Sequence, residues 1–440
     1  MEGLHRLLGR RGLLAGAGAL AAAGGVAASH APAQARVQTR ARIVIIGAGA
    51  AGLTTASRLA MRLDGAQITM LDKRALHHYQ PGYTLVAAGL KPADYVLSST
   101  REWVANGVNW VAEAAAEIDP VAKVVTTDAG QRLPYDFLIV AAGLSLDYAA
   151  IEGMDTSRIG QEGMGSVYAG PEEAVATWRA MSDFADRGGV GLFHRPTTEM
   201  KCAGAPLKYA FLTDDYLRRR GNRGRAELIY NAQSNSLFGV PIVAERVRML
   251  YEERGIRWTR QHVLTRIDLG RRLATFSTPQ GDTEMRYDFI NVVPPMRAPA
   301  VIRNSPLAWQ SGPFAADGWT EVDRHSLRHV RFPEVFCVGD VAGVPKGKTA
   351  ASVKWQVPVA VDHLVAAIED RVSDARYDGY TSCPLITRIG RAMLVEFDYH
   401  DNLVPSFPGV IAPLEELWIT WIIKEVGLKP TYLAMLRGMA

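Results

Sequence analysis

The sequence contains few cysteines, and their scarcity excludes several kinds of metal site. Only three occur in 440 residues, Cys202, Cys337 and Cys383, and none belongs to a C-x-x-C pair or to a Cys/His cluster at ligand spacing. Structural zinc sites and covalently attached haem require such clusters. We therefore predict that the chain has no metal site.

Long runs of positive charge are missing as well. The formal net charge is +4, and the one arginine-rich segment, at 218–225, stands alone. Proteins that bind nucleic acids usually carry a basic stripe or patch. We expect no nucleic-acid partner, and we interpret residues 218–225 as a solvated helix end and loop.

The N-terminal tract has the order of an export signal. Arg10 and Arg11 precede a segment, 12–29, that is made almost wholly of Ala, Gly, Leu and Val, and small residues follow at 33–35. This order predicts a twin-arginine-type signal peptide over residues 1–35 and a periplasmic protein at the bacterial inner membrane. An uncleaved anchor is the alternative, although so many glycines make a poor membrane helix.

A dinucleotide-binding fingerprint begins after residue 40. An apolar run over 42–46 leads into Gly47, Gly49 and Gly52, a helical pattern follows, and a second apolar run ends in Asp72. This order of strand, helix and strand is the context that the fingerprint needs, because the glycines admit a pyrophosphate and the acid accepts from ribose hydroxyls. Lys73, directly after the acid, is a further candidate contact.

Two later strand-like segments indicate that the nucleotide is FAD. Residues 135–143 end in Ala142 and Gly143, and residues 335–340 end in Gly339 and Asp340. They resemble the paired motifs of flavoproteins with two dinucleotide-binding domains, in which the final Gly-Asp contacts the ribityl chain. The resemblance implies a split FAD domain whose second part begins near residue 300.

The segment between these two parts lacks a second fingerprint. Its glycines at 188, 189 and 191 precede the apolar run instead of following it, and Arg195-Pro196 stands where the phosphate-binding turn would be. We predict that no nicotinamide nucleotide binds there, so the electrons come directly from a small substrate.

Two of the cysteines lie in settings that favour reactivity. Cys202 comes just before a helical pattern opened by Pro206, with Lys208 close by, and such a position lowers the pKa of a thiol. Cys383 lies in a turn-like segment. The residues alone leave two alternatives open, a redox pair or a structural disulfide that would stabilise the fold by about 5 kcal/mol. Cys337, inside an apolar strand, is interpreted as buried packing.

Several blocks of sequence resemble one family. They are HHYQPGYTL (77–85), KCAGAP (201–206), VVPPM (292–296), KTAA (348–351), YDGYTSCPL (377–385) and EFDY (396–399). These blocks look like those of sulfide:quinone oxidoreductases, particularly the subgroup that includes the mitochondrial enzymes, over nearly the whole mature chain. The resemblance favours the redox interpretation of Cys202 and Cys383, and it makes Gln80 a candidate FAD contact.

The resemblance also implies a mechanism. Hydrosulfide attacks a Cys202/Cys383 disulfide or sulfur-bridged form, which leaves a persulfide on Cys383 and a thiolate on Cys202 that reduces the flavin. Lys208 and Lys201 would stabilise the anionic states, and Lys348 would favour negative charge on the reduced flavin or the quinone. For each lysine a surface salt bridge is the alternative.

The electrons would then leave to a membrane quinone, and the resemblance implies that Phe397 lies against the quinone ring. Five apolar residues farther on follow helical spacing: Leu414, Leu417, Trp418, Trp421 and Ile422. They predict an interfacial amphipathic helix that ends near Lys424 and Gly427, followed by a second short segment over 432–436. A core or dimer helix is the alternative.

We therefore predict an α/β fold with two Rossmann-like domains of the disulfide-reductase type. The expected parts are residues 36–150 and 300–375 for the split FAD domain, 151–299 for the second domain, and 376–440 for a C-terminal region that contacts the membrane. The predicted function is FAD-dependent sulfide:quinone oxidation, with sulfide, a sulfane-sulfur acceptor and quinone as partners and self-association left open. The alternatives are the flavoprotein subunit of a flavocytochrome c sulfide dehydrogenase, a non-catalytic redox sensor that binds flavin and sulfur, and an NADH:quinone dehydrogenase.

Overall fold

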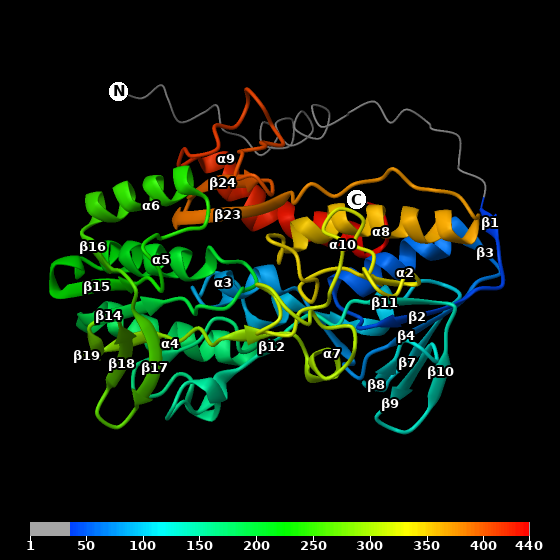
Figure 1. Ribbon diagram of the computed structural model, residues 1–440. Helices are drawn as coiled ribbons and strands as arrows, with labels where there is room; N and C mark the ends of the chain where they lie inside the picture. The colour runs from blue at the N-terminus through cyan, green and yellow to red at the C-terminus, as the bar shows by residue number, and fades with distance from the viewer. Residues whose placement is uncertain (1–35, 440) are drawn as a thin grey trace.

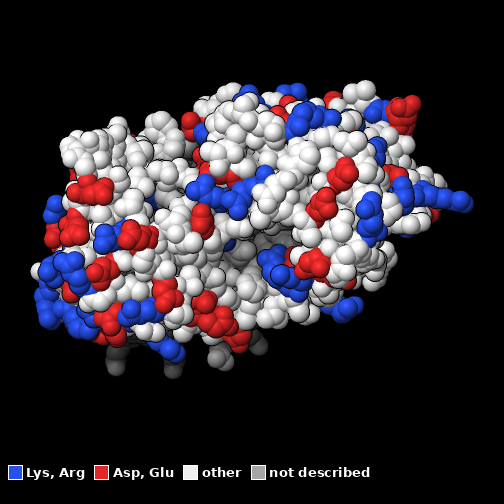
Figure 2. Space-filling model, turned by 60° about the horizontal axis from the view of Figure 1, so that its bottom comes forward, with Lys and Arg blue, Asp and Glu red and all other residues white. Residues whose placement is uncertain are grey.

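The computed structural model describes residues 36–439, and these residues form two five-stranded parallel sheets with helices packed on them. The signal peptide predicted over residues 1–35 lies outside the described residues. Figure 1 shows the two sheets in separate lobes, and Figure 2 shows a hollow between the lobes with lysine and arginine side chains along its rim. The predicted α/β class is confirmed.

The first sheet collects strands from distant parts of the chain, in the order β22-β11-β2-β4-β7. Its strands are β2 (Arg42–Ile46), β4 (Gln67–Leu71), β7 (Val108–Val111), β11 (Phe137–Val140) and β22 (Val335–Cys337). Residues Ile43 to Ile46 of β2 are buried, as expected for a central strand covered on both faces. Because β22 pairs with β11, the chain returns to this sheet after residue 300.

Helices and a small sheet cover the two faces of the first sheet. Figure 1 shows α2 (Ala50–Arg62) and α8 (Ala350–Ile368) above it. The antiparallel strands β8 (Ala115–Asp119), β9 (Val124–Thr127) and β10 (Arg132–Pro134) lie below it. The glycine turn between β2 and α2 therefore lies at the carboxyl edge of this sheet, where ligands of such folds bind.

The second sheet has the order β13-β20-β14-β15-β16. Its strands are β13 (Met164–Gly165), β14 (Gly189–His194), β15 (Ala226–Asn231), β16 (Ile256–Thr259) and β20 (Phe289–Asn291). In Figure 1, α5 (Ala205–Arg219) and α6 (Pro241–Arg254) lie above it and α4 (Pro171–Arg187) below. A meander of β17 (Val263–Asp268), β18 (Leu273–Thr278) and β19 (Gly281–Arg286) completes the lobe. The domain boundaries proposed from the sequence stay a prediction.

The C-terminal region joins the two lobes. A hairpin of β23 (Thr381–Arg388) and β24 (Arg391–Phe397) packs beside α5, and α9 (Trp418–Ile422) continues through a π-helical turn (Ile423–Gly427) into α10 (Leu428–Leu436). The Ser57 hydroxyl on α2 donates to the Leu436 carbonyl at 2.7 Å. The prediction that this helix ends near Lys424 and Gly427 is therefore wrong, because a π-turn carries it onward to pack on the first lobe.

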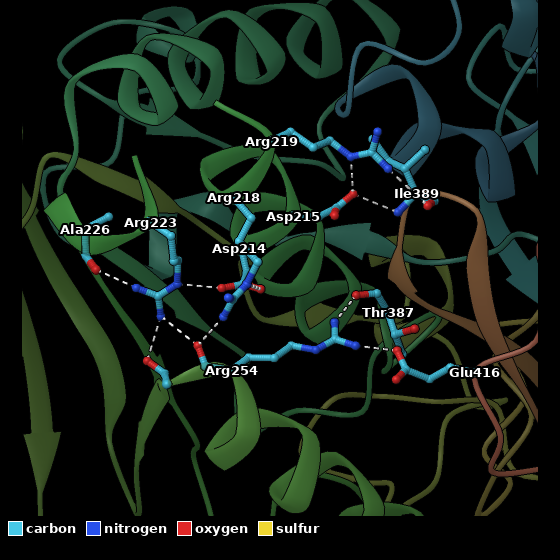
Figure 3. Close-up of polar contacts among 11 residues, drawn as sticks. Asp214, Asp215, Arg218, Arg219, Arg223, Ala226, Arg254, Thr387, Ile389 and Glu416 are labelled. Carbon is cyan, nitrogen blue, oxygen red and sulfur yellow. Dashed lines mark hydrogen bonds and ion pairs between the residues drawn. The ribbon is translucent and has the colours of Figure 1, made fainter. Parts of the chain in front are cut away.

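The arginine-rich segment 218–225 is a largely exposed helix end and loop, as predicted, but ion pairs anchor several of its arginines. Figure 3 shows its side chains pairing with two acids of α5. The Asp214 carboxylate, 1% exposed, accepts from Arg218 at 2.8 Å and from Arg223 at 2.5 Å. Asp215 accepts from Arg219 at 2.8 Å and from the Ile389 backbone amide at 3.0 Å. Local charge density alone gave no sign of these buried partners.

A second ion pair fixes the same hairpin from α6. The Arg254 guanidinium donates to the Thr387 carbonyl oxygen and to Glu416, and both acceptors belong to the C-terminal region (Figure 3). The Arg254 side chain is 10% exposed and that of Glu416 16%, so water screens the pair weakly. The ends of α5 and α6 thus hold the far end of β23.

Asp214→Ala should lower the free energy of unfolding by about 2–3 kcal/mol, because it removes the buried carboxylate that pairs with Arg218 and Arg223 and leaves them only backbone acceptors. Asp186→Ala is the matched control, since Asp186 is 65% exposed and pairs with Arg220 of the same arginine segment. The control should cost less than about 1 kcal/mol. Urea unfolding followed by tryptophan fluorescence measures both values, and equal losses would contradict the network's role.

Candidate functional site

The first glycine turn forms a cradle after β2. Gly47 has a φ of +104°, and a Cβ placed on Gly52 would stand 1.8 Å from the Gly47 carbonyl oxygen, so this approach requires glycine. A Cβ on Gly49 would meet no atom within 4 Å, which shows open space beside the turn. The helix α2 begins after Gly49 without a side-chain cap, so its first amides face that space as donors. The cradle therefore fits a pyrophosphate.

Asp72 directly follows β4 beside this turn and is 8% exposed. Its carboxylate accepts from the Ala48 amide at 2.8 Å and from the Arg74 guanidinium at 2.7 and 3.0 Å. Burial opposes the charge, but Arg74 and these amides hold the pKa of Asp72 below its usual range. Arg74 was missed in the sequence, where only its position two residues after the acid could have drawn notice. Lys73 is exposed, and its contact with FAD stays a prediction.

The other candidate FAD residues lie at the same edge of the sheet. Val140 pairs with Ile46 on one side and with Cys337 on the other, so the ends of β2, β11 and β22 are neighbours. The predicted residues that follow these ends are Gly47, Ala142, Gly143, Gly339 and Asp340. A Cβ on Gly143 would also meet open space. The free amides of α2, the open space beside Gly49 and Gly143, and the acid Asp72 together fit FAD. The cofactor would extend from the α2 amides toward Asp340.

Lys348 lies on this edge and is 5% exposed. Its ammonium group donates to the carbonyl oxygens of Asp340 at 2.6 Å and Ala342 at 3.0 Å, and it lies 3.6 Å from the centroid of the Trp319 ring. Burial lowers the pKa of Lys348 to about 8. The surface salt bridge considered as the alternative for Lys348 is therefore wrong. The backbone carbonyl oxygen of Lys348 also accepts a hydrogen bond from the Cys202 amide at 3.0 Å.

The two candidate redox cysteines meet where α5 begins. Cys202 precedes the helix with a φ of +48°, a region that few non-glycine residues occupy, and Tyr168 holds this turn by donating to its carbonyl oxygen at 3.0 Å. Cys383 comes from β23, so the expectation of a turn there is wrong. A Cβ on Gly204 would stand 2.6 Å from the Cys383 sulfur, which shows how closely the strand approaches the helix start.

The cysteines are free thiols, and their charges are unequal. A hydrogen bond from Cys383 and the nearby charges of Lys208 and Lys424 hold the pKa of Cys202 well below its usual range, although burial opposes this. The same hydrogen bond and burial raise the pKa of Cys383. Cys202 is thus the more acidic thiol of the pair, as predicted, although Cys383 contributes more to this than any nearby residue. The buried Cys337 shows the opposite effect, because burial raises its pKa to about 12.

Lys208 is the cation nearest the thiolate. It lies on the first turn of α5, is 2% exposed, and its Nζ donates to the Cys202 sulfur at 3.3 Å. Burial opposes its charge, but the two cysteine sulfurs raise the pKa of Lys208 above its usual value. Lys201 donates to Gln80 at 2.7 Å, and burial lowers its pKa to about 8. The salt-bridge alternative for Lys208 is wrong, since its partner is sulfur.

Lys424 is a member of the site that sequence reasoning missed. It lies in the π-helical turn, is 3% exposed, and donates to the Pro81 carbonyl oxygen at 2.6 Å. Burial and the charge of Lys208 lower its pKa to about 7, while the cysteines act in the opposite direction. The sequence did contain one sign of this position. Lys424 lies three residues after Trp421, so helical spacing places the lysine on the same apolar, buried face of the helix.

Phe397 ends β24 and is 8% exposed. Its backbone pairs with Thr381, two residues before Cys383 on the neighbouring strand. Its ring packs edge-on against Phe238 at 5.8 Å between centroids, and the Lys346 ammonium lies 5.6 Å from its centroid. Phe397 is therefore close to the redox hairpin, but its contact with a quinone stays a prediction.

Lys208→Met should raise the pKa of the Cys202 thiol, because it removes the positive charge closest to the thiolate. The inflection of the pH profile for alkylation of Cys202 should therefore move to higher pH, and alkylation should slow most at pH values between the old and the new inflection. Iodoacetamide labelling of the reduced protein, read by mass spectrometry of the Cys202 peptide, measures this. The control Lys354→Met, a half-buried lysine on α8, should leave the profile unchanged. An unmoved inflection in Lys208→Met would contradict the assignment.

Comparison with known proteins identifies relatives over most of the chain. Residues 41–173 match the family model for pyridine nucleotide-disulphide oxidoreductases. The chain is 34% identical over 369 residues to the Mus musculus protein named "Sulfide:quinone oxidoreductase, mitochondrial". It is 35% identical over 368 residues to the protein of the same name from Dictyostelium discoideum. Each alignment covers 83% of this chain and 80% of the relative.

A solved structure supports the fold. The structure of the sulfide:quinone oxidoreductase from Aquifex aeolicus superposes with a TM-score of 0.74 at 21% identity, covering 90% of this chain and 92% of that one. Together with the family match, this confirms the predicted disulfide-reductase type of fold.

The predicted compartment is not supported. The mouse and Dictyostelium relatives are both named mitochondrial, which argues against a periplasmic location. Within residues 36–439, none of the helices has the length and apolar character needed to cross a bilayer.

Proposed function

The chain belongs to the sulfide:quinone oxidoreductase family, and on this premise we propose that it oxidises sulfide to sulfane sulfur and passes the electrons through FAD to a quinone. The observation that carries the proposal is that Cys202 contacts both the second cysteine and the edge of the FAD cradle. Its sulfur pairs with Cys383 and Lys208, while its amide donates to Lys348, which also binds the Asp340 carbonyl oxygen. The backbone contact between Cys202 and Lys348 thus links the cysteine pair to the proposed FAD cradle.

The sulfur step begins from the oxidised pair, in which Cys202 and Cys383 are joined as a disulfide. Hydrosulfide attacks the Cys383 sulfur, a new S–S bond forms, the bond between the cysteines breaks, and Cys202 leaves as a thiolate. The sulfide sulfur is oxidised to a persulfide while the disulfide is reduced by two electrons. The low pKa of Cys202 makes it the better leaving group, which directs the attack to Cys383.

Turnover then requires the pair to lose its sulfane sulfur and two electrons. A nucleophilic acceptor takes the outer sulfur of the persulfide, and the cysteines re-form their disulfide as the electron pair leaves. Bound FAD supplies the two-electron acceptor and the link to the quinone. Lys208 holds the Cys202 thiolate in place, and Lys348 brings a buried positive charge to the edge where the flavin would lie.

We propose that the quinone approaches from the C-terminal face and that this face contacts the membrane. Four large apolar side chains are exposed there: Phe407 at 45%, Val410 at 78%, Trp418 at 57% and Val426 at 58%. Large apolar side chains left exposed on a helix and its flanking segments suit the boundary between lipid chains and headgroups. Trp421, by contrast, is 5% exposed and packs inward, so only one of the two predicted tryptophans belongs to this surface.

Cys202→Ser and Cys383→Ser should each slow sulfide-dependent flavin bleaching by at least about 1,000-fold, since each removes one sulfur of the exchanging pair. Anaerobic stopped-flow spectroscopy of the FAD-loaded enzyme, followed by decylubiquinone reduction, measures the effect. Cys337→Ala, which changes the remaining cysteine, should retain most of the rate. Unchanged bleaching in either serine variant would sink the proposed sulfur step.

The double variant Trp418→Ser/Val426→Ser should bind lipid vesicles at least about tenfold more weakly, because each side chain contributes roughly 1.5–3 kcal/mol when it leaves water. Vesicle flotation measures the bound fraction. Val121→Ser is the control: Val121 is 81% exposed but follows β8, and Figure 1 places that region on the side of the molecule opposite the C-terminal helices. Equal binding of wild-type protein and double variant would refute the membrane face.

A further inference from the structure

A second hollow lies away from the cysteines, at the carboxyl edge of the second sheet. Its volume is about 510 Å³. Arg195 follows β14, Gln233 follows β15, and Trp258 and Arg260 stand at the end of β16, so three neighbouring strands line it. This edge is where open α/β sheets bind their ligands, and the volume suits a small organic molecule.

Polar atoms around this hollow lack partners within the described residues. The Nε of Arg195 and the Oε1 of Gln233 are both buried without a hydrogen bond. One is a donor and the other an acceptor, so a single ligand with both kinds of group could satisfy them. Buried polar atoms in native proteins are nearly always paired, and both of these residues line the hollow.

The charge of the hollow favours an anion. Glu245 and Arg248 on its rim pair with each other at 2.6 Å, which leaves Arg195 and Arg260 without an ion pair in the described part of the chain. The helix α6 starts at the hollow, with Pro241 in its first turn and no side-chain cap. Its free amides and positive dipole end add to the two guanidinium groups. These groups together match a phosphate or a similar oxyanion.

The same hollow offers a flat surface. The Arg260 guanidinium lies over the Trp258 ring at 4.7 Å from the centroid, and both side chains line the cavity. Stacked guanidinium and indole planes bind planar rings well. The phosphate-binding turn of a nicotinamide site is not available, because Arg195-Pro196 and the Cys202 segment occupy the connection from β14 to α5.

We propose that this hollow binds a small ligand that carries both a phosphate group and a planar ring, of the class of nucleoside monophosphates. The phosphate lies between Arg195 and the first turn of α6, and the ring lies against Arg260 and Trp258. The site is separate from the FAD cradle and goes beyond sulfide oxidation. The proposal also gives a role to Arg195, because nothing in the catalytic site explains why an arginine stands directly after β14.

Isothermal titration of the FAD-loaded enzyme with AMP, adenosine and inorganic phosphate tests the proposal at low ionic strength. We expect one AMP per chain, bound at least tenfold more tightly than adenosine or phosphate alone, with flavin absorbance unchanged. Arg195→Gln and Arg260→Gln should each weaken AMP binding at least fivefold. Arg286→Gln, an exposed arginine on β19, is the matched control and should bind as the wild type does.

Three results would overturn the proposal. Adenosine binding as tightly as AMP would remove the anion site, and unchanged affinity in Arg195→Gln would place the ligand elsewhere. Loss of FAD during the AMP titration would mean that AMP competes for the cradle after β2. Far-UV circular dichroism and flavin content of each variant separate a lost site from a misfolded protein.

Discussion

The packing of β23 along α5 is the contact on which the site depends. The helix starts beside Cys202 and carries Asp215 in its last two turns, and the strand carries Cys383 near its beginning and leads to Ile389. At the near end, Gly204 leaves just enough room for the Cys383 sulfur. At the far end, Asp215 accepts from the Ile389 amide. Two contacts that far apart fix both the register and the angle of the strand, so two sulfurs from distant parts of the sequence meet.

Two buried lysines lie near the cysteine pair and affect the charge of its thiols. Lys208 and Lys424 are both nearly inaccessible, and each feels the charge of the cysteines. A thiolate in such surroundings is favoured by cations that water cannot screen. Lys424 is the lysine destabilised by this arrangement. Its pKa falls to about 7 because its positive charge is both buried and close to Lys208. The second cation of the centre is therefore the one most easily neutralised.

Features set by local sequence could be predicted, and features set by distant partners could not. The turn at Gly47 depends on residues within a few positions, and it was predicted. The low pKa of Cys202 was predicted from the helix start and the nearby lysines, but it depends also on Cys383 and Lys424, which are distant in sequence. The strand at Cys383 was mistaken for a turn, because its partner β24 and its neighbour α5 stabilise it from outside. The ion pairs of segment 218–225 could not be predicted, because their acceptors Asp214 and Asp215 are buried on α5. Lys424 looked like a helix end because a π-turn leaves no clear mark in sequence.

The position of Cys383 and Lys424 near the end of the chain has a consequence for biosynthesis. Both residues leave the ribosome after all strands of the two parallel sheets, and α10 must still dock on α2 through Ser57 and Leu436. Until then, a nascent chain holds Cys202 without its sulfur partner and without its second cation. The paired sulfurs and both buried lysines can therefore assemble only after the C-terminal segment has folded onto the two lobes.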